Sequence, residues 1–231
     1  MKQILFRCSS LGAIMTEPRS KSEVLSETCK TFLQEVFIRE KYGRKKDVSS
    51  KYMEKGTLVE EDGITLLSLF HNTFYKKNEE NFKNDYISGT PDIILKDKII
   101  DIKSSWNIFT FFKAKTDDIN KAYDWQLQGY MALTGAKEAE LVYVLTDTPD
   151  HILDGEKRSL AYKLGLGSEN DVKFKHLFDN IEKNGKYSDI IIEDRVFVKK
   201  VERCNKKIDN IYQKVELCRN FLKSEYGIQK S

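Results

Sequence analysis

The chain has 231 residues, a length that suggests one domain without excluding two. Hydrophobic residues make up 40% and aromatic residues 11%, so the chain can bury a sizeable core and is not disordered. No apolar run approaches the ~20 residues of a membrane span, and the N-terminal sequence lacks the apolar core of a signal peptide. We therefore expect a cytoplasmic protein with no membrane partner.

Cysteine usage and charge leave the function open. The four cysteines are scattered, with no Cys-x-x-Cys pair, which favours reduced thiols over a disulfide framework. Lys and Arg number 39 against 36 Asp and Glu, for a formal net charge of +3. This balance neither requires nor excludes nucleic acid, because basic residues that bind phosphates and acidic residues that bind metal nearly cancel.

The first part of the chain predicts helices. A short helix with a serine N-cap is expected at residues 9–16, and residues 22–38 carry apolar side chains at helical spacing. A third helix is expected at residues 50–70, although Gly56 and Gly63 interrupt it. Each glycine costs up to ~1 kcal/mol against alanine inside a helix, so we expect close packing or close approach of a ligand there.

The rest of the chain alternates strands and helices. We expect strands at 82–87, 91–95 and 98–104, a helix at 117–134, a strand at 141–145, helices at 150–164 and 169–183, a strand at 189–198 and a helix at 199–226. The first three strands are predicted to form an antiparallel meander. This order predicts one α/β domain over residues 1–231, with a small mixed sheet flanked by helices. Its core spans about residues 7–146, and a helical C-terminal extension covers 147–231.

The most informative segment is a predicted hairpin between two short runs rich in isoleucine. The Lys-Asp dipeptide between these runs forms a two-residue turn, which places Asp92 opposite Asp101. Directly opposed residues have Cβ atoms about 4.5–5.5 Å apart. Lys103 lies two residues beyond Asp101 and therefore points to the same face. Two carboxylates and one ammonium are thus expected to converge at the mouth of the hairpin.

Such a cluster favours metal chemistry. Opposed carboxylates repel each other, and a hard divalent cation such as Mg²⁺ would remove that repulsion. The lysine can then orient or activate a water for metal-assisted phosphodiester hydrolysis. The alternative is a hairpin with these charges on a solvated face. The Pro91-Asp92 pair at hairpin spacing, and the apolar opposite face with Ile100 and Ile102, favour the metal site.

Two further residues are candidates for the same site. Gln126 falls inside the apolar stripe of the helix at 117–134, whereas Gln128 falls outside it. A buried amide needs partners, so Gln126 either caps a carbonyl at the sheet edge or reaches the metal or the scissile phosphate. Glu60 belongs to an acidic run before the apolar segment 64–70. It lies either on a solvated face or inward, where it would add another carboxylate.

In order, these motifs resemble a known nuclease superfamily. Pro91-Asp92 followed by Asp101-x-Lys103 matches the PD-(D/E)XK nucleases, and Gln126-x-x-x-Tyr130 matches their RecB-like branch. Gly56-x-x-x-Glu60, and Cys8-Ser9 through Pro18-Arg19-Ser20, are similar to the phage lambda exonuclease and YqaJ-like viral recombinase nucleases. The similarity covers roughly residues 7–146.

The resemblance implies a restriction-endonuclease-like core and a Mg²⁺-dependent DNA exonuclease, with Mn²⁺ as a possible substitute. It implies digestion of linear duplex DNA from the 5′ end to give single strands for phage-type recombination. The implied partners are double-stranded DNA ends, a single-strand annealing protein and two further copies in a homotrimer. If the chain is phage-encoded, its location is the host cytoplasm. A DNA-end-binding module without turnover, or an endonuclease on the same fold, are the alternatives.

The resemblance also assigns residues. The implied metal ligands are Glu60, Asp92, Asp101 and the carbonyl of Ile102. Lys103 is the implied water-activating lysine and Gln126 the motif glutamine. Ser9 matches a serine that contacts a 5′-phosphate, although a plain helix cap explains it equally.

One departure concerns the end of the DNA. The family's arginine shortly after the motif lysine has no match, because residues 104–112 contain no arginine. Arg7, Lys113 or Lys115 are the expected substitutes. We therefore expect a reduced preference for 5′-phosphorylated ends.

Overall fold

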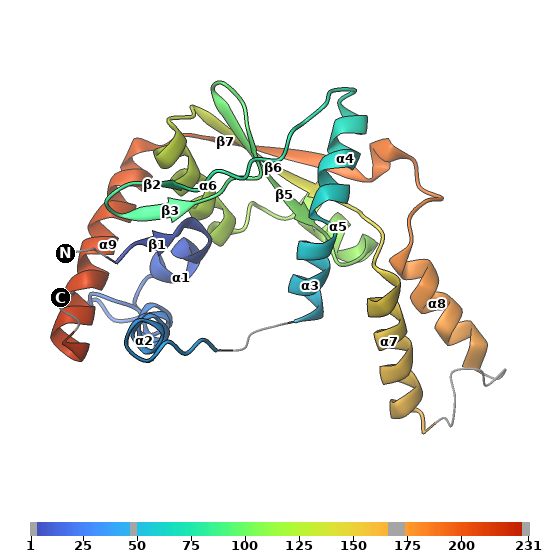
Figure 1. The fold of residues 1–231 in the computed structure, drawn as a ribbon, viewed down its shortest axis with the longest axis horizontal. Helices are drawn as coiled ribbons and strands as arrows, with labels where there is room; N and C mark the ends of the chain where they lie inside the picture. Colours follow the sequence, from blue (N-terminus) through green and yellow to red (C-terminus); the bar gives the residue numbers. More distant parts are fainter. Residues whose placement is uncertain (1–3, 47–49, 166–173, 228–231) are drawn as a thin grey trace.

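Two small β-sheets surrounded by helices make up the fold, which confirms the predicted mixed α/β class (Figure 1). A computed structural model describes residues 4–46, 50–165 and 174–227. The strands are β1 (Phe6–Arg7), β2 (Phe82–Lys83), β3 (Ile87–Gly89), β4 (Ile93–Ile94), β5 (Lys98–Ser104), β6 (Glu138–Val144) and β7 (Val196–Glu202). The helices are α1 (Leu11–Ile14), α2 (Glu27–Tyr42), α3 (Lys51–Leu58), α4 (Glu60–Phe70), α5 (Ile108–Thr116), α6 (Lys121–Thr134), α7 (Asp150–Lys163), α8 (Lys175–Gly185) and α9 (Asn205–Tyr226).

The larger sheet has the strand order β4-β5-β6-β7. Strand β5 runs antiparallel to β4 and parallel to β6, while β7 runs antiparallel to β6. In the β4–β5 hairpin Ile93 pairs with Ile100, and the Leu95 amide donates to the Lys98 carbonyl at 2.8 Å. This is the predicted register, and it places residue 92 opposite residue 101.

The expected three-strand meander is wrong. Strands β2 and β3 pair antiparallel but belong to a second sheet of order β1-β3-β2, in which β1 runs parallel to β3. Pro91 stands where the chain passes from this sheet to the larger one. Proline has no N–H to donate to a ladder, so pairing stops there and the strand does not continue through it.

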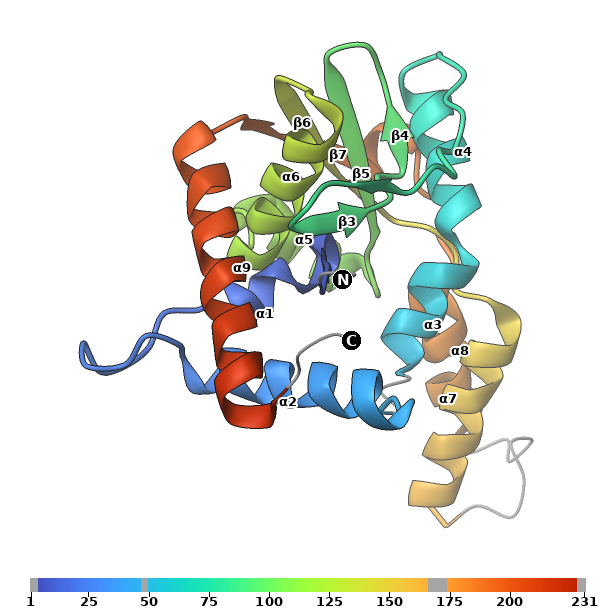
Figure 2. The same cartoon turned by 60° about the vertical axis from the view of Figure 1, so that its left-hand side comes forward.

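Helices cover both faces of the larger sheet, as the alternation of side chains in strands requires. Helix α4 packs on one face and α6 on the other, and α9 packs against α6, α1 and α2 (Figure 2). The buried residues on the α4 side include Ile64, Leu67, Ile93, Ile100, Val142, Val144 and Val196. Those on the α6 side include Ile99, Leu127, Met131, Leu141, Tyr143 and Ile211.

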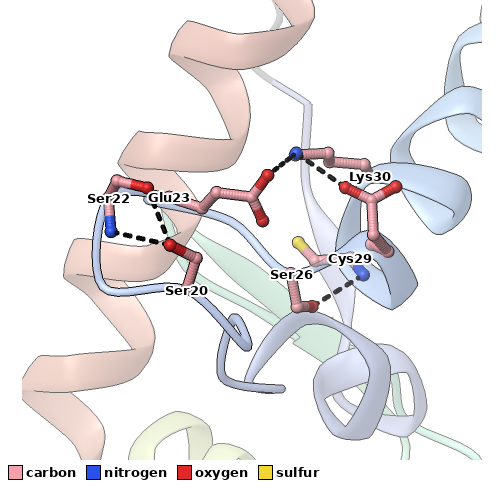
Figure 3. A network of polar contacts seen from close by, with 7 residues as sticks. Ser20, Ser22, Glu23, Ser26, Cys29 and Lys30 are labelled. Atoms are coloured by element: carbon pink, nitrogen blue, oxygen red, sulfur yellow. Dashed lines mark hydrogen bonds and ion pairs between the residues drawn. The ribbon is translucent and has the colours of Figure 1, made fainter.

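Helix α2 begins later than predicted because of its cap. The Ser26 hydroxyl accepts a hydrogen bond from the Cys29 amide at 3.1 Å, while Ser20 and Ser22 form a separate turn before it (Figure 3). Such a cap satisfies an amide that the first helical turn leaves without a partner. The helix then continues past residue 38 and ends before Gly43.

The single helix expected at residues 50–70 is two helices, α3 and α4, which meet at Val59. Close packing explains only one of the two glycines. A Cβ at Gly63 would lie 3.2 Å from the Ile102 side chain and 3.3 Å from that of Val144, so this glycine lets α4 approach the sheet. Nothing lies within 4 Å of a Cβ at Gly56, and the expectation of close packing there is wrong.

Other boundaries also differ from the prediction. The helix expected at 9–16 is a 3₁₀ turn, Cys8–Ser10, followed by the short α1, and no serine side chain caps α1. Helix α5 was not predicted. The C-terminal segment is helical as expected but also contributes β7 to the sheet, shifted from the predicted 189–198. The helix expected from 199 begins at Asn205, and part of the one expected at 169–183 lies outside the described residues.

Across the described ranges, no helix combines the length and apolar composition needed to cross a bilayer.

Candidate active site

The hairpin register brings Asp92 and Asp101 together. Asp101 lies in β5 with only 1% of its surface exposed, so the alternative of charges on a solvated face is wrong. Its Oδ2 atom forms an ion pair with Lys103 Nζ at 2.7 Å. On the opposite strand, Asp92 Oδ2 accepts a hydrogen bond from the Ile102 amide at 2.6 Å. Both carboxylates and the ammonium thus share one end of the hairpin.

Gln126 on α6 reaches this cluster. Its Nε2 atom donates to Asp101 Oδ1 at 3.4 Å and contacts the Tyr130 hydroxyl at 2.9 Å. Of the two roles left open by the sequence, contact with the acidic site is therefore the observed one. The spacing of the Gln126-x-x-x-Tyr130 motif places both side chains on the same helix face, one turn apart.

The sheet-edge role belongs to Gln128, which was wrongly expected to lie outside the buried stripe. Gln128 is 1% exposed. Its Nε2 donates to the Glu202 carbonyl at 2.9 Å, and its Oε1 accepts from the Cys204 amide at 2.9 Å. These two bonds occupy polar groups of the chain where β7 ends. They join α6 to the segment that leads into α9.

Glu60 begins α4 and lies beside the hairpin. Its carboxylate forms an ion pair with Lys77 at 3.3 Å, and about a third of its side chain is exposed. The charge of Glu60 contributes to the raised pKa of Asp92, so the residue belongs to the electrostatic environment of the site. No group of three or more His, Cys, Asp or Glu side chains in metal-binding geometry occurs among the described residues, so Glu60 as a third metal ligand stays a prediction.

Burial and neighbouring negative charges both oppose ionisation of Asp92. Burial raises the pKa of Asp92 to about 7, and the charges of Asp101 and Glu60 add to this, while the Ile102 amide and Lys103 oppose it. Burial acts to lower the pKa of Lys103, but the ion pair with Asp101 outweighs it. The pKa of Lys103 is therefore raised, and the side chain remains an ammonium at neutral pH.

This donor set fits a divalent cation. Asp101 Oδ2 is buried and has no hydrogen bond of regular geometry, and the ion pair with Lys103 is its described contact. Carboxylate oxygens are the ligands that Mg²⁺ prefers, and a cation between the aspartates would relieve their repulsion. Asp92 and Asp101 would hold it. The parts assigned to Glu60 and to the Ile102 carbonyl remain predictions.

The four residues expected to contact DNA are all exposed. Arg7 is in β1, Ser9 is in the Cys8–Ser10 turn, and Lys113 and Lys115 are on α5. The turn that carries Ser9 packs against α6, where the absence of a side chain at Gly129 leaves room for Cys8. The turn with Ser9 therefore packs against the helix that supplies Gln126, although no described contact joins these four residues to the aspartates.

The comparison with solved structures decides the family. The chain is similar to the crystal structure of a phage-related exonuclease from Haemophilus somnus 129PT, with 31% sequence identity and a TM-score of 0.71 over 96% of this chain and 94% of that one. The chain belongs to this family of exonucleases. The PD-(D/E)XK resemblance of the lambda-exonuclease type is thereby confirmed, as is the class of nuclease.

Two further structures show the same fold. The exonuclease is similar to the alkaline exonuclease LHK-Exo from Laribacter hongkongensis, at 16% identity and a TM-score of 0.64 over 96% of this chain and 89% of that one. The LHK-Exo complex with dAMP gives 16% identity and a TM-score of 0.62 over 96% and 93%. No protein-family model matches the exonuclease, and no curated protein matches its sequence.

Asn78, which fixes the start of the hairpin in this exonuclease, was not predicted from the sequence. The backbone N–H of Asn78 donates to the Asp92 carbonyl at 2.7 Å, and the side-chain Nδ2 donates to the Pro91 carbonyl at 2.9 Å. Its Oδ1 accepts from the Glu80 amide at 3.1 Å. A single asparagine in an irregular segment has no periodicity, so only the pairing of distant segments reveals this role.

Lys55 was also missed, although its ammonium lies at the end of β5, the strand that carries Lys103. It is 1% exposed, and its Nζ donates to the carbonyls of Ser105 and Trp106, each at 3.0 Å. Burial lowers the pKa of Lys55 to about 8. These bonds hold the chain immediately after β5. A lysine next to Gly56 in an amphipathic helix gives no sequence signal that it is buried.

Proposed function

We propose that this exonuclease hydrolyses linear duplex DNA from the 5′ end with Mg²⁺ at the Asp92–Asp101 pair. The observation that carries the proposal is the hairpin itself, in which two opposed carboxylates lie beside an ammonium 2.7 Å from one of them. When bound, the cation polarises the phosphodiester and lowers the pKa of a water. From the family resemblance we further propose a homotrimer whose single-stranded product passes to an annealing protein for recombination.

The side chains of the site have distinct tasks in this proposal. Asp92 and Asp101 hold the cation, and Gln126 fixes the orientation of Asp101 through its hydrogen bond. Because the pKa of Lys103 is raised, this residue acts as an ammonium that donates hydrogen bonds. It orients the attacking water and stabilises the negative charge that develops on the phosphate.

A single substrate series tests the proposal. We expect linear duplex to be digested in Mg²⁺, closed circular duplex to resist, and label to be released first from the 5′ end. Because residues 104–112 contain no arginine, 5′-phosphate and 5′-hydroxyl ends should be digested at similar rates. The measurement is release of acid-soluble nucleotide, with EDTA and the Asp101→Asn variant as controls. Rapid cutting of closed circles would indicate an endonuclease, digestion only from 3′ ends would reverse the polarity, and binding without digestion would leave an end-binding module.

Replacing Asn78 with alanine should weaken the site without removing any charge from it. The variant keeps the backbone N–H bond to the Asp92 carbonyl but loses the Nδ2 bond to the Pro91 carbonyl, which holds the residue before Asp92. Loss of a residue that orients a metal ligand typically lowers metal affinity or activity 10- to 100-fold, and because this support is indirect we expect a loss of about tenfold. The measurements are Mn²⁺ affinity by calorimetry and the rate of duplex digestion. Asn81→Ala is the matched control, because Asn81 lies in the same segment and its Nδ2 donates to the Thr90 side chain, away from the Pro91 and Asp92 carbonyls. Equal Mn²⁺ affinity in the two variants would contradict the role of Asn78.

A further inference from the structure

Helix α5 presents an uncovered aromatic and basic surface. Phe109 and Phe112 are 71% and 48% exposed, and Lys113 and Lys115 are exposed beside them. Residues 109, 112 and 113 follow helical i, i+3, i+4 spacing, so they share one face. The ammonium of Lys115 lies 5.7 Å from the centre of the Phe112 ring. Exposed phenylalanine rings beside lysines are typical of a surface that binds a partner with both negative charge and flat apolar groups.

The helix that carries this surface packs against the sheet of the active site. In the sheet, Lys103, Tyr143 and Phe197 lie side by side on three neighbouring strands. The Tyr143 and Phe197 rings stack with centroids 4.9 Å apart. Phe111, on the inner side of α5, packs edge-on against Phe197 at 4.9 Å. A row of aromatic rings thus connects the strand position of Lys103 to α5, which follows directly after β5 (Figure 1).

From this arrangement we propose that α5 binds single-stranded DNA next to the cleavage site. Unpaired bases would stack on Phe109 and Phe112, and Lys113 and Lys115 would bind the phosphates. Bases inside a duplex are already stacked on each other, so aromatic side chains select an unpaired strand, while lysines bind its phosphates without regard to sequence. The exposed acidic residues Asp117 and Asp118 directly follow α5, so the basic surface ends there. The inference rests on the proposed function.

The lysines favour nucleic acid over a second copy of the chain on this face. In a symmetric dimer about α5, Lys113 and Lys115 would face their own copies, and like charges brought together in this way are destabilising. A DNA strand instead offers a phosphate to each lysine and a base to each ring. The same face would suit the strand left behind after digestion of its complement.

The test is binding of a labelled single-stranded oligonucleotide by fluorescence anisotropy, in EDTA so that no cleavage occurs. We expect Phe109→Ala together with Phe112→Ala to weaken binding at least tenfold, because base–aromatic stacking is worth about that much per base. The slope of log affinity against log salt should not change. Lys113→Ala with Lys115→Ala should instead make that slope shallower by about 0.7 per lysine. Tyr162→Ala is the matched control, since Tyr162 is an exposed aromatic residue followed by a lysine on α7.

The binding measurements distinguish the proposed DNA surface from its alternatives. Unchanged affinity in the double phenylalanine variant, or an equal loss in Tyr162→Ala, would overturn the inference. A change in molar mass by light scattering, with affinity unchanged, would assign the face to contacts between copies instead. Failure of the proposed function would look different: the wild-type chain would leave duplex DNA undigested in Mg²⁺, whatever the phenylalanine variants do to single-strand binding. Far-ultraviolet circular dichroism checks that the variants fold.

Discussion

Replacing Lys103 with methionine is expected to slow duplex digestion by roughly 10²- to 10⁴-fold, the range typical of a side chain that assists proton transfer or stabilises charge in the transition state. The substitution keeps most of the side-chain volume and removes the ammonium that lies 2.7 Å from Asp101. Both the orientation of the attacking water and the compensation of charge on the phosphate would be lost. The measurement is single-turnover cleavage of a 5′-labelled linear duplex in saturating Mg²⁺.

The control for this variant is Lys98→Met on the same strand. Lys98 also forms a 2.7 Å ion pair, with Glu140, but at the other end of β5. Removing one partner of a buried ion pair is destabilising in itself, so both variants should melt earlier than the wild type. Only Lys103→Met should lose cleavage under conditions where it is folded. Comparable losses in the two variants would show that the effect is structural and that Lys103 has no special role.

The hairpin was predictable because its geometry is local. A two-residue turn between two isoleucine-rich runs fixes the register, and in a strand the register decides which side chains share a face. Asp92, Asp101 and Lys103 could therefore be placed together without knowledge of the rest of the fold. Gln126 could be placed in a buried stripe for a similar reason, since helical periodicity depends only on the sequence nearby.

The parts that could not be predicted depend on distant segments. The burial of Gln128 follows from the end of β7, more than 70 residues away in sequence. The bonds of Asn78 to the hairpin join an irregular segment to a strand, and no pattern in the sequence marks them. Strands β2 and β3 are too short for alternation to assign them to a sheet. At such positions tertiary contacts override local propensity.

Replacing Asp92 with asparagine should stabilise the metal-free protein at high pH, although it removes a metal ligand. The pKa of Asp92 is raised from 3.8 to about 7. A raised carboxyl pKa gives stability that is fully present below about pH 4 and is lost as the pH rises through about 7. In the wild type this contribution is therefore absent at pH 8. An asparagine never ionises, and its oxygen can still accept the hydrogen bond from the Ile102 amide.

The experiment is denaturant unfolding in EDTA at pH 5 and pH 8. At pH 8 we expect Asp92→Asn to be more stable than the wild type by about 2 to 4 kcal/mol, since each pKa unit corresponds to about 1.4 kcal/mol. At pH 5 the difference should be much smaller. Added Mg²⁺ or Mn²⁺ should reverse the order at pH 8, because a ligand stabilises only the protein that binds it.

Asp97→Asn is the matched control, because Asp97 lies in the exposed turn of the same hairpin and pairs with Lys137. That variant should follow the wild type at both pH values and respond normally to metal. If Asp92→Asn also followed the wild type in EDTA, burial and the charges of Asp101 and Glu60 would not disfavour ionisation of Asp92 in the folded chain. If metal stabilised Asp92→Asn and the wild type equally, Asp92 would not be a ligand. Stability lost at pH 8 and regained with metal is the behaviour expected of carboxylates that the fold brings together for a cation.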